Sequence, residues 1–169
     1  MPNLKYYKMY DDVTEPVFAT KGSACFDICA YVKGVELFTY NDSSRKNVPK
    51  QLRQDNNSVG IYPGERLMIP TGIIFDIPEN HSVRLHPRSG LAYKNGLTIV
   101  NGEGVIDSDF VDELKILIIN TSEVNQVINH GDRVCQGEMI KDLSYSFILQ
   151  DKPPKSKTDR DGGFGSTGK

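Results

Sequence analysis

Short apolar or alternating runs, separated by turn-forming residues, most constrain what this 169-residue chain can fold into. Apolar and polar residues that alternate over a few positions are typical of half-buried β-strands. Gly, Pro and Asn separate these runs, as at Pro63-Gly64 and Asn95-Gly96. The runs are CFDICAYV (25–32), RLMIP (66–70), GIIFDIP (72–78), SVRLHP (82–87), LTIV (97–100), ELKILIIN (113–120), RVCQGEMI (133–140) and SFIL (146–149). Because no long stretch keeps a helical apolar period, the sequence predicts an all-β barrel or jelly-roll-like sandwich.

Length and composition favour one compact domain followed by a tail. Domains typically run ~100–200 residues, and an apolar fraction of 38% suffices for a packed core. We expect residues 1–150 to form that domain. The segment 151–169 starts with a stiff Pro153-Pro154 spacer and ends in a glycine-rich run, so it cannot build a core of its own. We expect a flexible arm, and its regular GGFGSTG run favours docking over disorder.

The segment 33–57 differs in character from the rest of the domain. It contains NDSSRKNVPKQLRQDNN, which is polar, mixed in charge and poor in apolar residues. We expect a long surface insertion, flexible at least in part, between strands. A solvated loop is the favoured interpretation, and binding of a partner protein through this segment is the alternative.

Charge and cysteine usage exclude several classes of protein. The net charge of −2 and a pI of about 5.9 argue against a protein that binds a nucleic-acid backbone. The odd set Cys25, Cys29 and Cys135 has neither a disulfide framework nor zinc-site spacing, so we expect reduced thiols. The sequence shows no signal-peptide-like run and no stretch long enough to span a membrane. A cytoplasmic protein without nucleic-acid or membrane partners is therefore expected.

The run HPRSGLA (86–92) is a candidate anion site. A strand ends at Pro87, and a short helical turn over 89–94, N-capped by Ser89, is expected to follow. Free amides at a helix start attract anions, Arg88 adds a bidentate donor, and Gly90 lets the backbone approach closely. An N-capped turn with a surface arginine is an equally weighted alternative from the residues alone.

The run LTIVNGEGVIDSDF (97–110) is a candidate site for a base and a catalytic carboxylate. Asn101-Gly102 between two apolar runs predicts a β-hairpin whose exposed backbone could contact a planar base. Asp107 closes the second strand, and we expect the carboxylate of Asp109, two residues further on, to point the same way, because residues i and i+2 of a strand share a face. One of these carboxylates could deprotonate water as a general base; two solvated carboxylates at a strand end is the alternative.

Two further runs are ambiguous by themselves. In HGDRVCQG (130–137), Gln136 could reach a phosphate or merely a backbone group. The last residues, GFGSTGK, fit the start of a P-loop. A P-loop needs a preceding strand and a following helix, so this match is rejected.

Together with GSACFDICAY (22–31), these runs resemble, in order along the chain, the motifs of the homotrimeric dUTP pyrophosphatases (dUTPases). The combination of PRSGLA, N-x-x-G-V-I-D and GGFGSTG is specific, and only 33–57 falls outside the resemblance. It implies a jelly-roll-like subunit, a distorted β-barrel, in a homotrimer with active sites at subunit interfaces. The implied reaction converts dUTP and water to dUMP and pyrophosphate, with Mg²⁺ on the triphosphate. That reaction limits uracil in DNA and supplies dUMP for dTMP synthesis.

The resemblance also implies residue roles. Asp107 falls on the aspartate that activates water for attack on the α-phosphorus, Arg88 falls on the phosphate-binding run, and Asp27 would support the metal through water. Further substrate contacts would come from Ser89, Gly90, Asn101, Gly104, Val105, Ile106, Lys115 and Gln136. In the arm, Phe164 would stack on uracil, with Gly165 and Ser166 closing beside it.

This chain departs from the family pattern in three places. Phe110 stands where tyrosine is usual, so the ring can pack under the deoxyribose but the phenol hydrogen bond is lost. Val111-Asp112 replaces a frequent Arg-Gly, which affects local interface contacts. The arm motif around Arg160 is one residue shorter than usual, which leaves open whether Arg160 reaches the γ-phosphate.

Two alternatives to a dUTPase remain open at this point. A dCTP deaminase shares the fold and the trimer, but the 101–107 hairpin and the arm fit a dUTPase better. A non-catalytic trimeric β-module, with a partner-binding role for 33–57, would not need Asp107, Arg88 and Phe164 in one chain.

Overall fold

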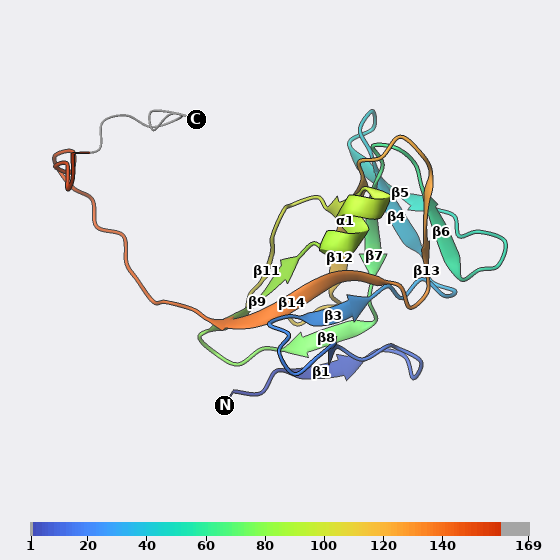
Figure 1. Cartoon of the computed structure of the whole chain (residues 1–169), viewed down its shortest axis with the longest axis horizontal. Helices are drawn as coiled ribbons and strands as arrows, with labels where there is room; N and C mark the ends of the chain where they lie inside the picture. The colour runs from blue at the N-terminus through green and yellow to red at the C-terminus, as the bar shows by residue number, and fades with distance from the viewer. Residues whose placement is uncertain (1, 160–169) are drawn as a thin grey trace.

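Strands dominate the computed structural model, which describes residues 2–159 (Figure 1). In chain order the elements are β1 (Lys5–Lys8), β2 (Val17–Phe18), β3 (Phe26–Cys29), β4 (Leu37–Asn41), β5 (Lys46–Lys50), β6 (Ser58–Ile61), β7 (Arg66–Pro70), β8 (Ile73–Asp76), β9 (His81–His86), α1 (Ser89–Asn95), β10 (Leu97–Ile99), β11 (Gly104–Ile106), β12 (Lys115–Asn120), β13 (Gln126–Asn129) and β14 (Arg133–Lys141). The predicted all-β class is confirmed.

The strands form two larger sheets and two small ones, all with antiparallel pairing. One five-stranded sheet has the order β10-β12-β7-β4-β5, and the other has the order β11-β9-β14-β3-β2. The pairs β1-β8 and β13-β6 form two-stranded sheets. These sheets do not close into one continuous barrel, so the architecture is a jelly-roll-like sandwich rather than a closed barrel.

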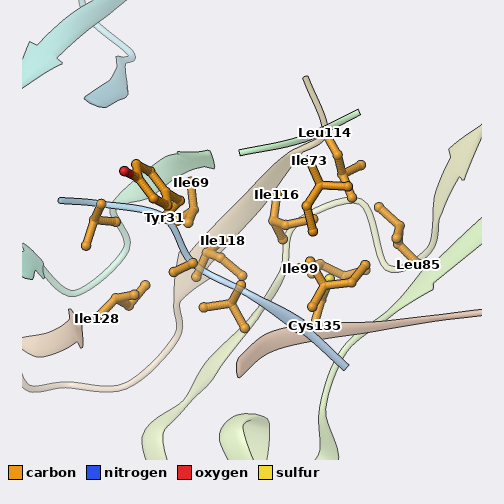
Figure 2. Close-up of a cluster of buried hydrophobic side chains, with 14 of the residues drawn as sticks. Tyr31, Ile69, Ile73, Leu85, Ile99, Leu114, Ile116, Ile118, Ile128 and Cys135 are labelled. Carbon is orange, nitrogen blue, oxygen red and sulfur yellow. The ribbon is translucent and has the colours of Figure 1, made fainter. Parts of the chain in front are cut away.

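The core lies between the inner faces of the two large sheets. Ile69, Ile116 and Ile118 from the first sheet share one buried cluster with Leu85 and Cys135 from the second (Figure 2). Alternation explains the pattern, because every second side chain of a strand points to the same face. Burying one such aliphatic side chain contributes roughly 1.5–3 kcal/mol, so this cluster fixes how the sheets stack.

The segment 33–57, expected as a surface insertion that is flexible at least in part, contains a regular hairpin. β4 pairs with β5 along its length and with β7 on its other side. Leu37 is completely buried, which anchors the hairpin to the core. The polar composition of the segment gives no sign of these strands because β5 is a sheet edge, where an exposed lysine, Lys46, and a proline, Pro49, are tolerated. Partner binding through this segment stays a prediction.

The chain leaves the domain after β14 and extends away from it (Figure 1). The strand expected at 146–149 is not formed. Large apolar side chains here are 78–94% exposed, namely Leu143, Tyr145, Phe147, Ile148 and Leu149. A strand needs a neighbour to bond with, and the described chain offers this segment none. No helix within residues 2–159 is long and apolar enough to cross a membrane.

Candidate active site

An N-cap at Ser89 predicts a helix that starts at residue 90. The helix of the HPRSGLA run instead starts one position earlier, at Ser89. Arg88 is the N-cap, with φ −90° and ψ 122°, and α1 starts at Ser89. The prediction of Ser89 as N-cap is wrong, because the extended conformation that follows Pro87 ends at Arg88 and no side chain caps the helix. The first amides of α1 therefore lack intrahelical partners and point out of the helix start.

Arg88 belongs to a charged cluster built on β3 and β14. Its Nε donates to Oδ1 of Asp27 at 3.0 Å, and its Nη1 donates to the carbonyl of Arg133 at 3.0 Å. Arg133 Nη1 donates to the other oxygen, Oδ2, of Asp27 at 3.0 Å. Asp27 is only 8% exposed. Charge-assisted hydrogen bonds from two guanidinium groups neutralise the charge of this nearly buried carboxylate.

Arg133 is a site residue that the sequence reasoning missed. Regular strand alternation places Arg133 and Gln136, three positions apart, on opposite faces of β14. The signal that could have found it is its basic side chain next to the Gly131-Asp132 turn, close to the expected phosphate contact.

Gln136 joins the same cluster through the backbone. It pairs with Asp27 on one side and with His86 on the other. Its Nε2 donates to the carbonyl of Pro87 at 3.1 Å, and its contact with a phosphate stays a prediction. Three runs far apart in the sequence thus meet at the start of α1.

Ser89 and Gly90 lie exposed at the start of α1. A Cβ added at Gly90 would meet no atom within 4 Å, and its φ is not in the left-handed region. Neither backbone strain nor packing within the chain requires glycine there. Glycine at this position leaves the backbone amides open to a ligand from outside.

The expected hairpin around Asn101 is only partly correct. The turn exists, with Gly102 at φ 70° and its amide bonded to the carbonyl of Ile99 at 3.3 Å. The flanking strands do not pair with each other, because β10 pairs with β12 and β11 pairs with β9, in different sheets. The turn crosses the sandwich, and each strand is an edge of its own sheet. The free edge of each strand keeps backbone groups that the ladders do not use.

Asp107 follows directly after β11 and is exposed. Within residues 2–159 its carboxylate has no hydrogen-bond or ion-pair partner. The amide of Phe110 donates to the carbonyl of Asp107 at 3.2 Å, so the chain turns here. The prediction that Asp107 and Asp109 share a strand face is therefore wrong, because the strand has already ended.

Phe110, in the loop after β11, and Lys115, the first residue of β12, lie close together. Both line an open depression of about 530 Å³ that also includes Ile106 and Met9. The Phe110 ring is 40% exposed, so it offers an apolar surface. Lys115 Nζ lies 3.8 Å from Glu113 Oε2 and is half exposed, which leaves its ammonium accessible.

The two groups of site residues lie at opposite ends of β9. Ile106 pairs with Val83, which places Asp107 at the start of the strand, whereas Arg88 follows its end. β9 has six residues and is therefore about 20 Å long. One chain does not bring Asp107 and Arg88 together. The expected arm residues Arg160, Phe164, Gly165 and Ser166 lie outside the described residues.

The thiols beside the cluster are not activated. Burial raises the pKa of Cys29, with Asp27 adding to the shift and Arg133 and Arg88 opposing it. Burial also raises the pKa of Cys135 to about 12. A thiol needs its thiolate form to act as a nucleophile, so neither group serves the site in that role.

Comparison with known proteins supports the resemblance independently. Residues 55–168 match the family model for dUTPase. A deoxyuridine 5'-triphosphate nucleotidohydrolase of Finegoldia magna is 36% identical over 154 residues, covering 90% of this chain and 90% of that protein. The corresponding protein of Hydrogenobaculum sp. is 33% identical over 161 residues, covering 95% and 94%.

Solved structures show the same fold. The dUTPase of Staphylococcus bacteriophage 80alpha, with dUpNHpp, matches with a TM-score of 0.76 over 99% of both chains at 19% identity. A dUTPase of phage phi11 of S. aureus, described with a structural Mg(II) ion, matches with a TM-score of 0.69 at 18% identity, over 91% of this chain and 100% of that one. Given the identities of the curated relatives and the extent of the family match, the chain belongs to the dUTPase family.

Proposed function

We propose that this chain hydrolyses dUTP to dUMP and pyrophosphate, and so limits uracil in DNA and supplies dUMP for dTMP synthesis. Relatives at 33–36% identity bear the name of that activity. The observation that carries the proposal is the cluster in which Asp27, Arg88 and Gln136 meet at the start of α1. A site with guanidinium donors and open amides suits a triphosphate.

Arg88 serves as the main phosphate donor in this proposal. Two of its nitrogens are held by Asp27 and by the Arg133 carbonyl, so the plane of the guanidinium is fixed. Its remaining donors, with the Ser89 hydroxyl and the amide of Gly90, are available to phosphate oxygens. Donors fixed before the reaction stabilise the charge that develops on those oxygens as the bond breaks.

Asp107 serves as the general base. Its carboxylate is exposed and has no partner among the described residues, so it is free to accept a proton. The water oxygen attacks the α-phosphorus in line, and the bond from that phosphorus to the leaving pyrophosphate breaks. The water proton passes to Asp107, and dUMP and pyrophosphate leave.

The free edges of β10 and β11 are proposed to recognise uracil. Each strand is a sheet edge, so the main chain from Gly104 through Ile106 and the amide of Asn101 can pair with the polar edge of a planar base. A close fit excludes the thymine methyl group. Phe110 would pack under the deoxyribose and exclude a 2′-hydroxyl, and Lys115 in the same depression would contact substrate.

The residues present fit Mg²⁺ held mainly by the substrate. Within residues 2–159 no group of three or more His, Cys, Asp and Glu side chains forms a metal site. Mg²⁺ commonly uses one or two carboxylates together with substrate phosphates and water. Asp27 is the carboxylate in the cluster, and it would support the ion through water. Bound there, Mg²⁺ would neutralise charge on the phosphate oxygens.

A homotrimer with active sites between subunits is proposed as the working form. Asp107 and Arg88 lie at opposite ends of β9, so a complete site needs Asp107 from one subunit and the Arg88 cluster from another. The exposed apolar side chains of 143–149 support self-association, because such a surface is unfavourable in water. The arm beyond them would close over a site, with Phe164 stacked on uracil.

A cytoplasmic location is proposed for this activity. Cys25, Cys29 and Cys135 are all free thiols. Free thiols are usual in a reducing compartment.

Pyrophosphate release from each deoxynucleoside triphosphate, and from UTP, tests the proposal in the presence of Mg²⁺. We expect turnover of dUTP far above that of dTTP, dCTP or UTP. Ammonia release from dCTP would instead identify a deaminase of the same fold. Inactivity on every deoxynucleotide would favour a non-catalytic β-module.

Truncation after Pro154 tests the role of the arm. Residues 143–159 extend away from the domain, so removal of the chain beyond Pro154 should leave the fold intact (Figure 1). We expect turnover to fall strongly while the melting temperature stays close to that of the full chain. Full turnover by the truncated protein would show that the arm has no part in catalysis.

A further inference from the structure

We infer that Arg133 is a positioning residue for the reaction: through the shared Asp27 carboxylate and its own carbonyl, it orients the Arg88 guanidinium toward the substrate phosphates. This inference rests on the proposed function. Strand β14 contains an irregularity that regular alternation does not predict.

A β-bulge places Arg133 on the side of the cluster. Gln136 pairs with Asp27 and Cys135 with Ile28, but the next pair is Arg133 with Cys29, so the register shifts between Arg133 and Cys135. Val134 is the extra residue, and it and Cys135 are consecutive yet both buried, at 2% and 0% exposure.

The bulge brings the Arg133 and Gln136 side chains to one face. Residues directly opposite in an antiparallel pair point to the same face, so Gln136 lies on the face of Asp27, and Arg133 lies on that of Cys29. Asp27 and Cys29 share a face because they are two positions apart. Without the extra residue, Arg133 would point into the core. Bulges next to functional sites commonly aim a side chain in this way.

Arg133 fixes Arg88 in two ways. Its carbonyl accepts from Arg88 Nη1 at 3.0 Å, and its own Nη1 holds Oδ2 of Asp27 at 3.0 Å. The other carboxylate oxygen, Oδ1, accepts from Arg88 Nε at 3.0 Å. Because Arg133 holds one oxygen, the carboxylate cannot rotate freely, and the direction in which it holds Arg88 is set.

The burial of the cluster gives these contacts their weight. The Asp27 side chain is 11% exposed and that of Arg88 is 25% exposed, whereas that of Arg133 is 52% exposed. A nearly buried carboxylate binds its donors more strongly than an exposed one, since water competes less. Arg133 is thus a partly solvated residue attached to a nearly buried one, as expected for a residue that acts through its neighbour.

A double-mutant cycle separates positioning through Asp27 from a direct phosphate contact by Arg133. The proteins are full-length wild type, Arg133→Met, Asp27→Asn and the double variant, with Arg133→Lys as the conservative variant. Arg53→Met is the matched control, since it also removes one exposed arginine but in the segment 33–57. KM and kcat for dUTP are measured with Mg²⁺, and melting temperatures establish that each variant folds. Asp27→Ser replaces Asp27→Asn should the latter fail to fold.

Arg133→Met should raise KM for dUTP about tenfold, because a charge-assisted hydrogen bond is lost. Arg133→Lys should recover most of the affinity lost in Arg133→Met. The KM of Arg53→Met should match that of wild type. In the Asp27→Asn background, Arg133→Met should change KM by less than about threefold, since residues that act through one another are not additive. An unchanged KM in Arg133→Met, or an equal effect in both backgrounds, would overturn the inference.

Affinity for inorganic pyrophosphate keeps this inference separate from the proposed function. Calorimetric titration of the same proteins with pyrophosphate and Mg²⁺ should show the same non-additive loss. If the wild type failed to hydrolyse dUTP, the proposed function would fall while the pyrophosphate cycle still decided the role of Arg133. If the wild type hydrolysed dUTP and both cycles were additive, only the positioning role would fall.

Discussion

Arg88 and Asp107 lie at opposite ends of β9, the six-residue strand between them, in a single chain. Both belong to the runs that carry the resemblance to dUTPases, so both are expected at one site. The strand is about 20 Å long. Movement of the two side chains alone cannot bring them to one triphosphate across that distance. The arrangement agrees with the proposed homotrimer, in which the two ends at one site come from different subunits.

Asp107→Asn should remove most turnover and leave the fold unchanged. The amide keeps the size of the side chain but cannot accept the proton of water, and general-base catalysis typically contributes ~10²–10⁴-fold. The carboxylate is exposed and unpartnered among the described residues, so no structural contact is lost. Steady-state release of pyrophosphate measures kcat, and titration with dUpNHpp measures binding. Normal turnover by this variant would rule out the proposed role of Asp107.

Gly90→Ala should stabilise the protein slightly and weaken substrate binding. The added methyl group meets no atom within 4 Å, and alanine in a helix is favoured over glycine by roughly 0.5–1 kcal/mol. A phosphate that approaches the amide of Gly90 would instead meet the methyl group, so KM should rise several-fold.

Thermal unfolding and dUTP kinetics on the same preparation check both parts of this prediction. Gly60→Ala is the matched control, because a Cβ there also meets no atom within 4 Å, and it should leave KM unchanged. A wild-type KM for Gly90→Ala would mean that substrate does not approach this amide.

Alkylation of the native protein near neutral pH should modify Cys25 before Cys29 and Cys135. Cys25 is partly exposed and the other two are buried. Burial raises the pKa of Cys135 to about 12, so its reactive thiolate is scarce at neutral pH. Mass spectrometry after timed exposure to iodoacetamide gives the order. Early labelling of Cys135 would show that the interior around β14 opens readily.

Buried strands of the domain could be predicted from the sequence because their signals are local. The run 66–70 coincides with β7, and the run 113–120 contains β12, since continuous apolar residues mark both. The helix at Ser89–Asn95 follows from the extended Pro87 and the turn-forming residues after it. Each prediction needs only neighbours in the sequence.

Long-range pairing could not be predicted. Strands β10 and β11 flank a turn that has every local mark of a hairpin, yet each pairs with a strand of a different sheet. The edge strand β5 is polar because one side faces solvent, so it has the composition of a loop. Regular alternation places Arg133 on the wrong face of β14, because one extra buried residue in that strand reverses the face on which the Arg133 side chain lies. These features depend on partners that the local sequence does not name.

Restoration of activity from two inactive variants tests the shared site most directly. Asp107→Asn and Arg88→Ala each remove one half of the site, and the two chains can be co-refolded in equal amounts from denaturant. With sites between subunits, random trimers contain some sites with both Asp107 and Arg88, and activity should return to roughly a quarter of wild type. Each variant refolded alone should remain inactive. With both residues required from one chain, every site would carry a defect, and an inactive mixture would contradict the account.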